Sequence, residues 1–296
     1  MESQRPARLA VGVVSAGRVG SVIGAALHAA GHRVVATSGL SDASVARART
    51  LLPGVPIYPA DEVVPRAELV VLAVPDPVLP DLIAGLSRRR AWQAGQIVLH
   101  TSARFGIDVF APAAESHILP IALHPAMRFS GSPMDLERLP DACVAVTTTP
   151  ALRPVGEALV IEMGAEPVWV EPAGRARYAT AIAHAVDHLP VVVDQAAELL
   201  SAAEVYGGRR LLATLMLTAL EGALREETRG DGVAALTDLE HLRADLDRLH
   251  ESAPDSRAVH LALARAAASR AIAAGVLPPI DVDGLLDILT TPPAAD

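Results

Sequence analysis

Short apolar runs alternate with amphipathic segments through the first half of the chain. The amphipathic segments repeat apolar residues at helical spacing, at residues 19–31, 44–52 and 77–86. The apolar runs are hydrophobic throughout, which is typical of strands in a parallel sheet that is covered on both faces. These runs predict strands at residues 8–15, 33–38, 55–58, 69–75, 96–101, 118–124, 143–149 and 167–170.

The pattern changes near Glu171-Pro172, where long helical stretches rich in Ala, Leu and Arg begin. Turn residues at Gly207-Gly208 and at Pro254 divide these stretches. The sequence therefore predicts two domains. Residues 1–171 form an α/β domain and residues 172–289 an all-helical domain for substrate binding and dimerisation, with a frayed tail at residues 290–296.

A glycine-containing turn, S-A-G-R-V-G, follows the first predicted strand and opens the first helix. In a dinucleotide-binding turn the first Gly makes the turn, the second admits the pyrophosphate, and the third packs the helix on the strand. Gly17 and Gly20 take the second and third places, and Ser15 takes the first. We therefore expect a Rossmann domain with a doubly wound parallel sheet. Its cofactor-binding residues would be Ser15, Ala16, Gly17, Arg18, Val19 and Gly20.

The second predicted strand ends in Thr37-Ser38, where an NAD enzyme normally carries an acidic residue that binds the ribose 2′-hydroxyl. This chain offers hydroxyl groups at Thr37, Ser38 and Ser41 instead. Arg47 or Arg49 lies a helix turn away. The pattern favours NADP, bound as NADPH, because these groups suit a 2′-phosphate; NAD remains possible.

Polar or turn residues also follow three later strands, at the sheet edge where ligands bind in open α/β folds. They are Pro75-Asp76, Thr101-Ser102 and His124-Pro125. The imidazole of His124 titrates near neutral pH and would donate a proton to a ketone; a structural His bonded to backbone is the alternative. Thr101 and Ser102 would hold a carbonyl oxygen or the nicotinamide, or form a plain turn.

Composition excludes several classes of function. The net charge is −9, all 25 basic residues are Arg, and the chain has neither Lys nor Asn. Schiff-base chemistry needs Lys, and nucleic-acid binding needs a basic face, so neither is expected. The N-terminus lacks the apolar core of a signal peptide and no run of about 18 apolar residues occurs, so we expect a cytoplasmic protein without membrane contact. The single cysteine, Cys143, is interpreted as a small core residue.

Three segments resemble a group of bacterial Rossmann-like proteins whose helical second domain has no known function. They are LVVLAVPD (69–76), HTSARFG (100–106) and LHPAMRFSG (123–131). The group is similar in fold to ketopantoate reductase, pyrroline-5-carboxylate reductase and 6-phosphogluconate dehydrogenase. This resemblance covers nearly the whole chain and implies a homodimer. The His-Pro segment also resembles an element of prephenate dehydrogenases in which His bonds the substrate hydroxyl, which implies that role for His124.

The chain departs from this resemblance at several positions. Ala103 stands where the group usually has Gly, and Asp187 where it usually has Asn. The Lys and Asn used by ketopantoate reductases and 6-phosphogluconate dehydrogenases are missing. His184 and His188 are spaced four residues apart on one predicted helix, but no third ligand is evident, so no metal site is predicted.

The leading hypothesis is an NADPH-dependent oxidoreductase that reduces a small 2-oxo acid, with ketopantoate as the substrate implied by the resemblance. His124 would supply the proton, Ser102 would polarise the carbonyl, and Arg175 or Arg177 would bind the carboxylate. The alternatives are a prephenate-type dehydrogenase, an imine reductase, or a catalytically inert NADP-binding regulatory protein. The catalytic candidates are His124, Ser102, Tyr178 and Asp187, and the cofactor candidates beyond the glycine turn are Thr37, Ser38, Ser41, Pro75 and Thr101.

Overall fold

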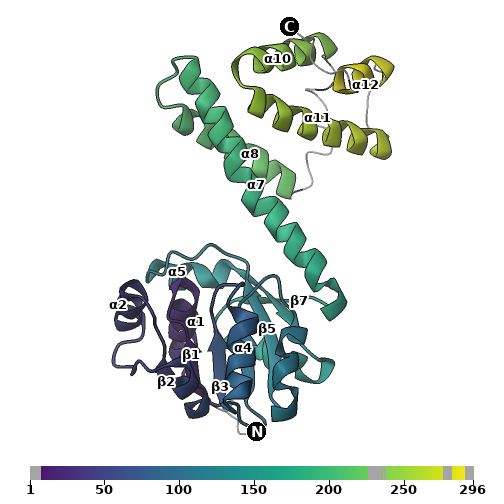
Figure 1. Ribbon diagram of the computed structural model, residues 1–296. Coiled ribbons are helices and arrows are strands. Elements are labelled where there is room, and N and C mark those ends of the chain that lie inside the picture. The colour runs from purple at the N-terminus through teal and green to yellow at the C-terminus, as the bar shows by residue number, and fades with distance from the viewer. Residues whose placement is uncertain (1–7, 226–235, 237, 276–281, 291–296) are drawn as a thin grey trace, which may run out of the picture. The chain divides into compact units, whose positions relative to one another are not determined.

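The computed structural model describes residues 8–225, 236, 238–275 and 282–290 (Figure 1). The chain divides into two compact units, residues 1–185 and residues 186–296. The boundary falls inside the long helix α7 (Arg175–Ala202). This helix begins close to residue 171, where the hydrophobic pattern of the sequence changes.

The first unit is built on a seven-stranded sheet with the order β2-β1-β3-β4-β5-β6-β7. Strands β1 to β5 are parallel, so the predicted doubly wound Rossmann sheet is confirmed there. The strands are β1 (Ala10–Val14), β2 (Arg33–Thr37), β3 (Leu69–Leu72), β4 (Ile97–His100), β5 (Leu119–Pro125), β6 (Cys143–Thr147) and β7 (Glu166–Trp169).

The far end of the sheet departs from the predicted parallel arrangement. β6 runs antiparallel to β5, and β7 is parallel to β6. A parallel connection needs a helix long enough to carry the chain back across the sheet. Between β5 and β6 the chain forms only α5 (Met134–Arg138) and a short 3₁₀ turn (Leu139–Asp141), so β6 starts at the edge where β5 ends.

Two further expectations were wrong. The predicted strand at residues 55–58 forms only one isolated bridge, between Thr37 and Ile57. Pro56 and Pro59 lack N–H groups, which prevents a regular ladder there. Cys143, expected in the core, is exposed because it is the first residue of β6, while Val144 and Val146 of that strand are buried.

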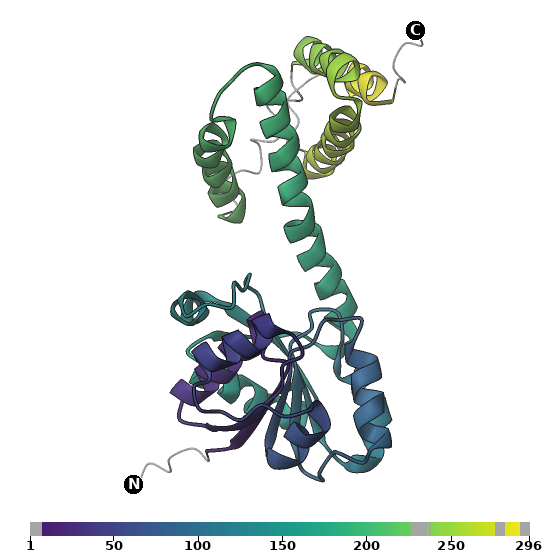
Figure 2. The same cartoon turned by 60° about the vertical axis from the view of Figure 1, so that its left-hand side comes forward.

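Helices cover both faces of the sheet, as Figures 1 and 2 show. The side chains of strand β3 pack against helices on both faces. Leu69 and Val71 belong to one buried cluster, with side chains of α1 and α6. Val70 and Leu72 belong to the other, with side chains of α4. A strand buried on both faces must be apolar at successive positions, which explains the unbroken runs in the sequence. The helices of this unit are α1 (Arg18–Ala29), α2 (Asp42–Leu51), α3 (Ala60–Val63), α4 (Leu79–Arg88), α5 and α6 (Arg153–Glu162), with 3₁₀ segments at Val64–Arg66, Ile107–Ser116, Pro150–Leu152 and Pro172–Gly174.

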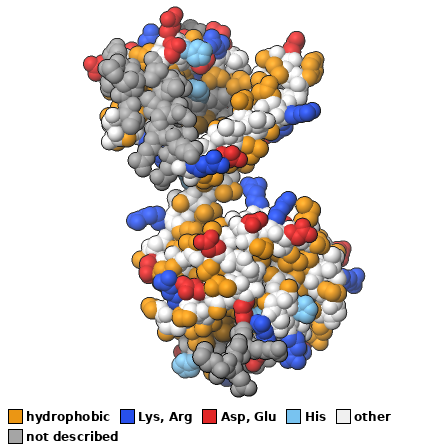
Figure 3. Space-filling view, turned by 180° about the vertical axis from the view of Figure 1, so that it is seen from behind, with side chains coloured by type: hydrophobic (Ala, Val, Ile, Leu, Met, Phe, Trp, Pro, Cys, Tyr) orange, Lys and Arg blue, Asp and Glu red, His pale blue; other side chains and the backbone are white. Residues whose placement is uncertain are grey.

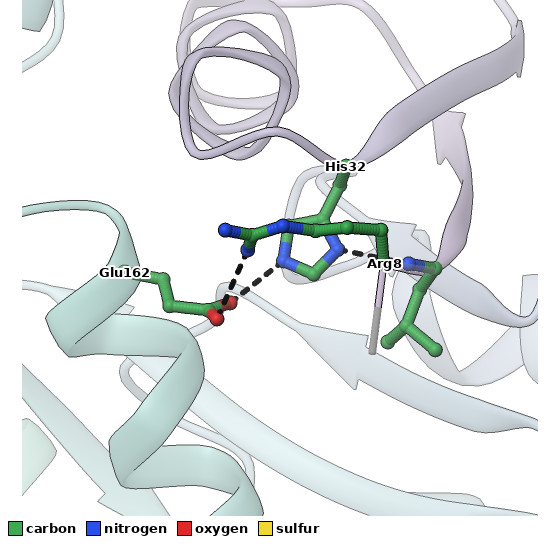
Figure 4. Close-up of polar contacts among 4 residues, drawn as sticks. Arg8, His32 and Glu162 are labelled. Carbon is green, nitrogen blue, oxygen red and sulfur yellow. Dashed lines mark hydrogen bonds and ion pairs between the residues drawn. The ribbon is translucent and has the colours of Figure 1, made fainter. Parts of the chain in front are cut away.

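A polar cluster joins the first βαβ unit to α6 near the amino ends of β1 and β2 (Figure 4). His32 is buried, and its Nδ1 accepts a 3.1 Å hydrogen bond from the backbone N–H of Leu9. Its Nε2 therefore carries the proton and donates to Glu162 at 2.7 Å. Arg8 also contacts Glu162, at 3.1 Å. These contacts hold α6 against the amino ends of β1 and β2.

The described part of the second unit is helical, as predicted. Its helices after α7 are α8 (Gly208–Leu224), α10 (Leu239–Ser252), α11 (Pro254–Ala274) and α12 (Val282–Thr290). Side chains of α10, α11 and α12 form its core cluster, among them Leu242, Ala268 and Leu285. Of the predicted tail, Thr290 ends α12 and the rest lies outside the described residues. None of the helices within the described ranges is long and apolar enough to cross a membrane.

Candidate functional site

The glycine turn leaves the start of α1 open. Gly17 is the N-cap residue, and no side chain within the described ranges caps this helix end. The first turn of a helix has backbone N–H groups without intrahelical partners, and its positive dipole end attracts anions. The turn that carries Ser15, Ala16, Gly17, Arg18, Val19 and Gly20 is therefore a suitable cradle for a pyrophosphate.

Gly17 and Gly20 serve different purposes in this turn. A Cβ atom at Gly20 would lie 2.1 Å from the backbone oxygen of Ser15 and 2.9 Å from the Cβ of Ala73, so the packing of α1 on the sheet requires glycine. A Cβ atom at Gly17 would meet only the Oγ of Ser15, at 3.5 Å, which is an ordinary contact. The space beside the Cα atom of Gly17 is therefore not filled by the protein, as expected where a ligand approaches the backbone.

Ser15 adopts the left-handed backbone conformation, with φ of +74°, at the place where the usual turn has its first glycine. Its N–H donates to the Oγ of Ser38 at 2.9 Å, and the N–H of Ala16 donates to the carbonyl oxygen of Ser38 at 2.7 Å. The end of β2 therefore holds the turn in place. The Ser15 backbone is strained because a side chain disfavours positive φ.

We expect the Ser15→Gly variant to melt at a higher temperature, because glycine relieves a conformation that costs about 1 kcal/mol for other residues. Its affinity for NADPH should equal or exceed that of the parent. The Ser15→Ala variant is the control, since it removes the hydroxyl and keeps the strain. A tenfold loss of NADPH affinity in both variants would instead identify the Ser15 hydroxyl as a ligand.

The hydroxyl groups at the end of β2 are mostly committed to the protein. Thr37 is fully buried and donates to the carbonyl oxygen of Val13 at 3.1 Å. Ser38 is 7% exposed and accepts the bond from Ser15. Ser41 is exposed but forms a capping box with Ser44 at the start of α2. The geometry thus makes Thr37 a structural residue, which the sequence pattern alone did not reveal.

At the same edge of the sheet, His124 of β5 and Tyr178 of α7 form a direct hydrogen bond. The Nδ1 of His124 and the Oη of Tyr178 are 2.7 Å apart, and the rings meet edge to face. The sequence predicted both residues as catalytic candidates, and the structure brings them together across 54 positions of the chain.

A buried arginine lies beside this pair. Arg175 is 2% exposed and donates to the carbonyl oxygen of Ser102 at 2.6 Å and to the Oγ1 of Thr147 at 3.3 Å. Its guanidinium lies 5.2 Å from the centre of the Tyr178 ring, and its Nε has no hydrogen-bond partner in the described part of the chain. Burial lowers the pKa of Arg175 to about 10, so the group stays charged at neutral pH.

This environment makes both members of the pair neutral. Burial, and then the charge of Arg175, lower the pKa of His124 to about 4, against the opposing influence of Asp76. Burial raises the pKa of Tyr178 above its ordinary value, and Arg175 partly opposes that shift. The expectation that His124 would titrate near neutral pH is therefore corrected: the imidazole is uncharged there.

The neutral pair offers a single hydrogen-bond donor to a ligand in either tautomer. If the Tyr178 hydroxyl donates to Nδ1, the imidazole proton is on Nε2 and is available. If Nδ1–H donates to the phenol oxygen, the hydroxyl proton is available instead. In both cases the proton that can be released leaves a tyrosinate beside Arg175.

The segment H-T-S-A-R-F-G after β4 is a fixed turn. His100 is fully buried; its Nδ1 accepts from the N–H of Ser102 at 3.2 Å, and its Nε2 donates to the carbonyl oxygen of Gly106 at 3.1 Å. The Oγ of Ser102 accepts from the N–H groups of Arg104 and Phe105. Ser102 therefore shapes the turn and presents its carbonyl to Arg175. Thr101 is half-buried at the end of β4.

Pro75 is exposed after β3. Asp187 is exposed on the part of α7 that belongs to the second unit, as is His188. No group of three or more residues of the types that bind metals occurs within the described ranges.

Comparison with known proteins identifies two domains along the chain. A Rossmann-like domain matches residues 1–125, and a domain of unknown function, DUF2520, matches residues 142–267. The chain therefore carries a Rossmann-like domain followed by a DUF2520 domain. No curated protein matches the chain.

Solved structures resemble this DUF2520 protein over most of its length. The imine reductase from Pseudomonas sp. is 17% identical with a TM-score of 0.66, over 96% of this chain and 100% of that one. Protein TM1727 from Thermotoga maritima is 12% identical with a TM-score of 0.66, over 90% and 99%. A proposed NADP oxidoreductase, BF3122 from Bacteroides fragilis, is 16% identical with a TM-score of 0.68, over 88% and 98%. At these identities the likeness shows a shared fold.

Two roles in the DUF2520 protein were missed from the sequence. Arg175 was considered only as a partner for a substrate carboxylate, yet it is a buried cation whose charge, after burial, is the second cause of the lowered pKa of His124. Thr147 was considered only as part of a strand, yet its hydroxyl helps hold that cation. Neither residue belongs to a recognisable motif; the available signal was an Arg three positions before a helical Tyr, a spacing that makes the two residues neighbours on the helix surface.

Proposed function

We propose that the DUF2520 protein is an NADPH-dependent oxidoreductase that reduces a carbonyl or imine carbon of a small molecule. The observation that carries this proposal is the neutral His124–Tyr178 pair at the sheet edge where the open glycine turn also lies. The resemblance in fold to proteins described as imine reductases and as an NADP oxidoreductase supports it. When bound, the nicotinamide supplies a hydride.

The protein's own contribution is a proton for the substrate oxygen or nitrogen. The proton leaves Tyr178 directly, or leaves the Nε2 of His124 while the Tyr178 proton moves to Nδ1. Either route ends with a tyrosinate, whose negative charge the guanidinium of Arg175 stabilises at short range. The carboxyl of Asp76 lies close enough to act electrostatically on His124.

The proposed substrate is a small 2-oxo acid, with ketopantoate as one member of the class. A pocket of about 300 Å³ in the first unit is lined by Arg104, Gly106, Asp108 and Arg175, among others. Its size suits a small acid. The exposed guanidinium of Arg104 can bind a carboxylate through two parallel hydrogen bonds.

Imine reduction is the second candidate. It is favoured by the imine reductases from Pseudomonas sp. and Streptomyces aurantiacus, which align over 96% and 95% of this chain. Oxidation of NADPH across a panel of 2-oxo acids and cyclic imines distinguishes the two. Tight NADPH binding without turnover on either class would identify a binding protein and overturn the enzymatic proposal.

We expect the Arg47→Ala variant to lose NADPH affinity about tenfold or more while its NADH affinity stays unchanged, since a hydrogen bond to a charged group contributes about 1.5–3 kcal/mol. Arg47 is half-buried on α2 and has no hydrogen bond or ion pair within the described ranges, so its charge is available to a 2′-phosphate. Fluorescence titration with both cofactors measures the change. Arg49→Ala on the exposed side of the same helix is the matched control; equal losses for the two variants would refute the assignment.

We also propose that the protein is a homodimer joined through its helical unit. Helix α8 exposes large apolar side chains, with Leu215 and Leu217 62% and 60% exposed. Apolar side chains also reach the surface in the face drawn in Figure 3. Several large apolar side chains exposed on one helix are typical of an interface. We expect a Leu215→Glu, Leu217→Glu double variant to elute as a monomer in size-exclusion chromatography with light scattering, whereas Leu40→Glu, an exposed change in the first unit, leaves the mass unchanged.

A further inference from the structure

A segment far from the glycine turn in sequence lies against it in space. Ser130–Ser132 follows β5, whose carboxyl end lies at the same edge as that of β1. A Cβ atom at Gly131 would lie 2.8 Å from both Cδ and Nε of Arg47, and 3.0 Å from the Cα of Arg18. Figures 1 and 2 show α5, which follows this segment, beside α1. Gly131 thus lies against the start of α1 and against the Arg47 side chain of α2, and both helices border the proposed cofactor site.

A buried carboxylate holds the segment in this position. Asp135 is fully buried, and its two oxygens accept from the N–H of Gly131 at 2.7 Å and the hydroxyl of Ser130 at 3.0 Å. The hydroxyls of Ser130 and Ser132 are 2.8 Å apart. Because a buried carboxylate is costly without its hydrogen bonds, these contacts fix the segment. Gly131 itself has φ of +80°, which favours glycine.

The segment limits where the side chain of Arg47 can lie. The Cδ and Nε atoms of Arg47 lie so close to the Cα of Gly131 that the space beside this Cα holds a hydrogen atom but not a Cβ atom. Neither Arg47 nor Arg18 has a hydrogen bond or ion pair within the described ranges, so neither positive charge near the start of α1 is paired directly with a carboxylate there. An anion bound there would gain from both charges and from the helix dipole.

We propose that Ser130–Ser132, anchored by Asp135, is a specificity element of the cofactor site: it positions Arg47 to bind the 2′-phosphate of NADPH. This inference rests on the proposed function and adds a determinant outside the glycine turn and the end of β2. Gly131 is a positioning residue: because it has no side chain, the Arg47 side chain can lie against its Cα atom.

The test compares two glycine substitutions with the same backbone strain. Gly131 has φ of +80° and Gly95 has φ of +77°, but a Cβ at Gly95 would meet nothing within 4 Å. Both substitutions should therefore lower the melting temperature, Gly131→Ala by at least as much because its Cβ also meets Arg18, while only Gly131→Ala displaces Arg47. We expect Gly131→Ala to weaken NADPH binding about tenfold and to leave NADH binding unchanged, and Gly95→Ala to change neither.

A purely structural role for the segment would lower the affinities for NADPH and NADH equally, and that result would overturn the inference, as would unchanged affinities. If Gly131→Ala does not fold, Ser130→Ala removes one hydrogen bond to Asp135 at an exposed position and should lower the NADPH-to-NADH affinity ratio in the same direction; an unchanged ratio refutes the inference. In an Arg47→Ala background, Gly131→Ala should have no further effect on that ratio. A parent protein that binds neither dinucleotide would instead overturn the proposed function.

Discussion

Replacing Gly17 by Val should abolish dinucleotide binding and leave the fold intact. The structure has room for a side chain at this position, since the nearest neighbour of a Cβ atom there would be the Ser15 Oγ at 3.5 Å, and its φ of −70° is open to any residue. A branched side chain would nevertheless occupy the approach of the pyrophosphate to the N–H groups of α1. Losing two hydrogen bonds to a charged group, at about 1.5–3 kcal/mol each, corresponds to about 10²- to 10⁴-fold in affinity.

Gly20→Ala is the informative contrast, three positions along the same turn. Its Cβ would lie 2.1 Å from the backbone oxygen of Ser15, so we expect a loss of stability and not a selective loss of binding. Titration with NADPH, together with circular dichroism and thermal melting, separates the two outcomes. A folded Gly17→Val protein that binds NADPH as the parent does would exclude the glycine turn as the pyrophosphate site.

Tyr178→Phe and His124→Ala should each lower turnover by about 10²- to 10⁴-fold on a confirmed substrate and leave NADPH affinity nearly unchanged. Tyr178→Phe removes the proton that the pair releases, and His124→Ala removes its partner at 2.7 Å. The loss should appear in kcat more than in KM if the pair acts on developing charge. Steady-state kinetics measure this loss, and thermal melting checks that the variants are folded. Full turnover in a folded Tyr178→Phe protein would remove the pair from the mechanism.

The pH dependence of turnover gives an independent check on the same pair. The pKa of His124 is lowered to about 4 and that of Tyr178 is raised above its ordinary value. At pH values between these two pKa values the protonation state of the pair does not change. If the protein is the proposed reductase, its kcat should therefore be nearly constant from about pH 6 to about pH 9 and decline only as Tyr178 ionises in more alkaline solution. A decline centred near pH 6.5 would indicate that an imidazolium donates the proton.

Local signals were enough to predict the sheet, the glycine turn and the residues at the strand ends. Leu69 to Leu72 are apolar at every position because both faces of β3 are buried. Gly20 is required by its contact with Ser15, five positions earlier in the same turn. His124 lies at the end of β5, directly before Pro125. Each of these features leaves a pattern within a few residues.

Features that depend on distant parts of the chain were not predictable in the same way. The charge state of His124 follows from burial and from Arg175, which is held by Ser102 and Thr147 from two other elements. The hydroxyl of Thr37 is used by the neighbouring strand β1. No window of sequence contains these pairs together.

The reversed strands have a consequence for work on isolated fragments. The DUF2520 match begins at residue 142, yet β6 and β7 complete the sheet of the first unit. A fragment that ends before residue 142 would leave β5 as an unpaired edge, with backbone groups open to another chain. It would also lack Tyr178 and Arg175, while the complementary fragment would lack His124. The boundary between the two domain matches therefore passes through one folding unit and through the proposed site, so neither fragment is suited to expression alone.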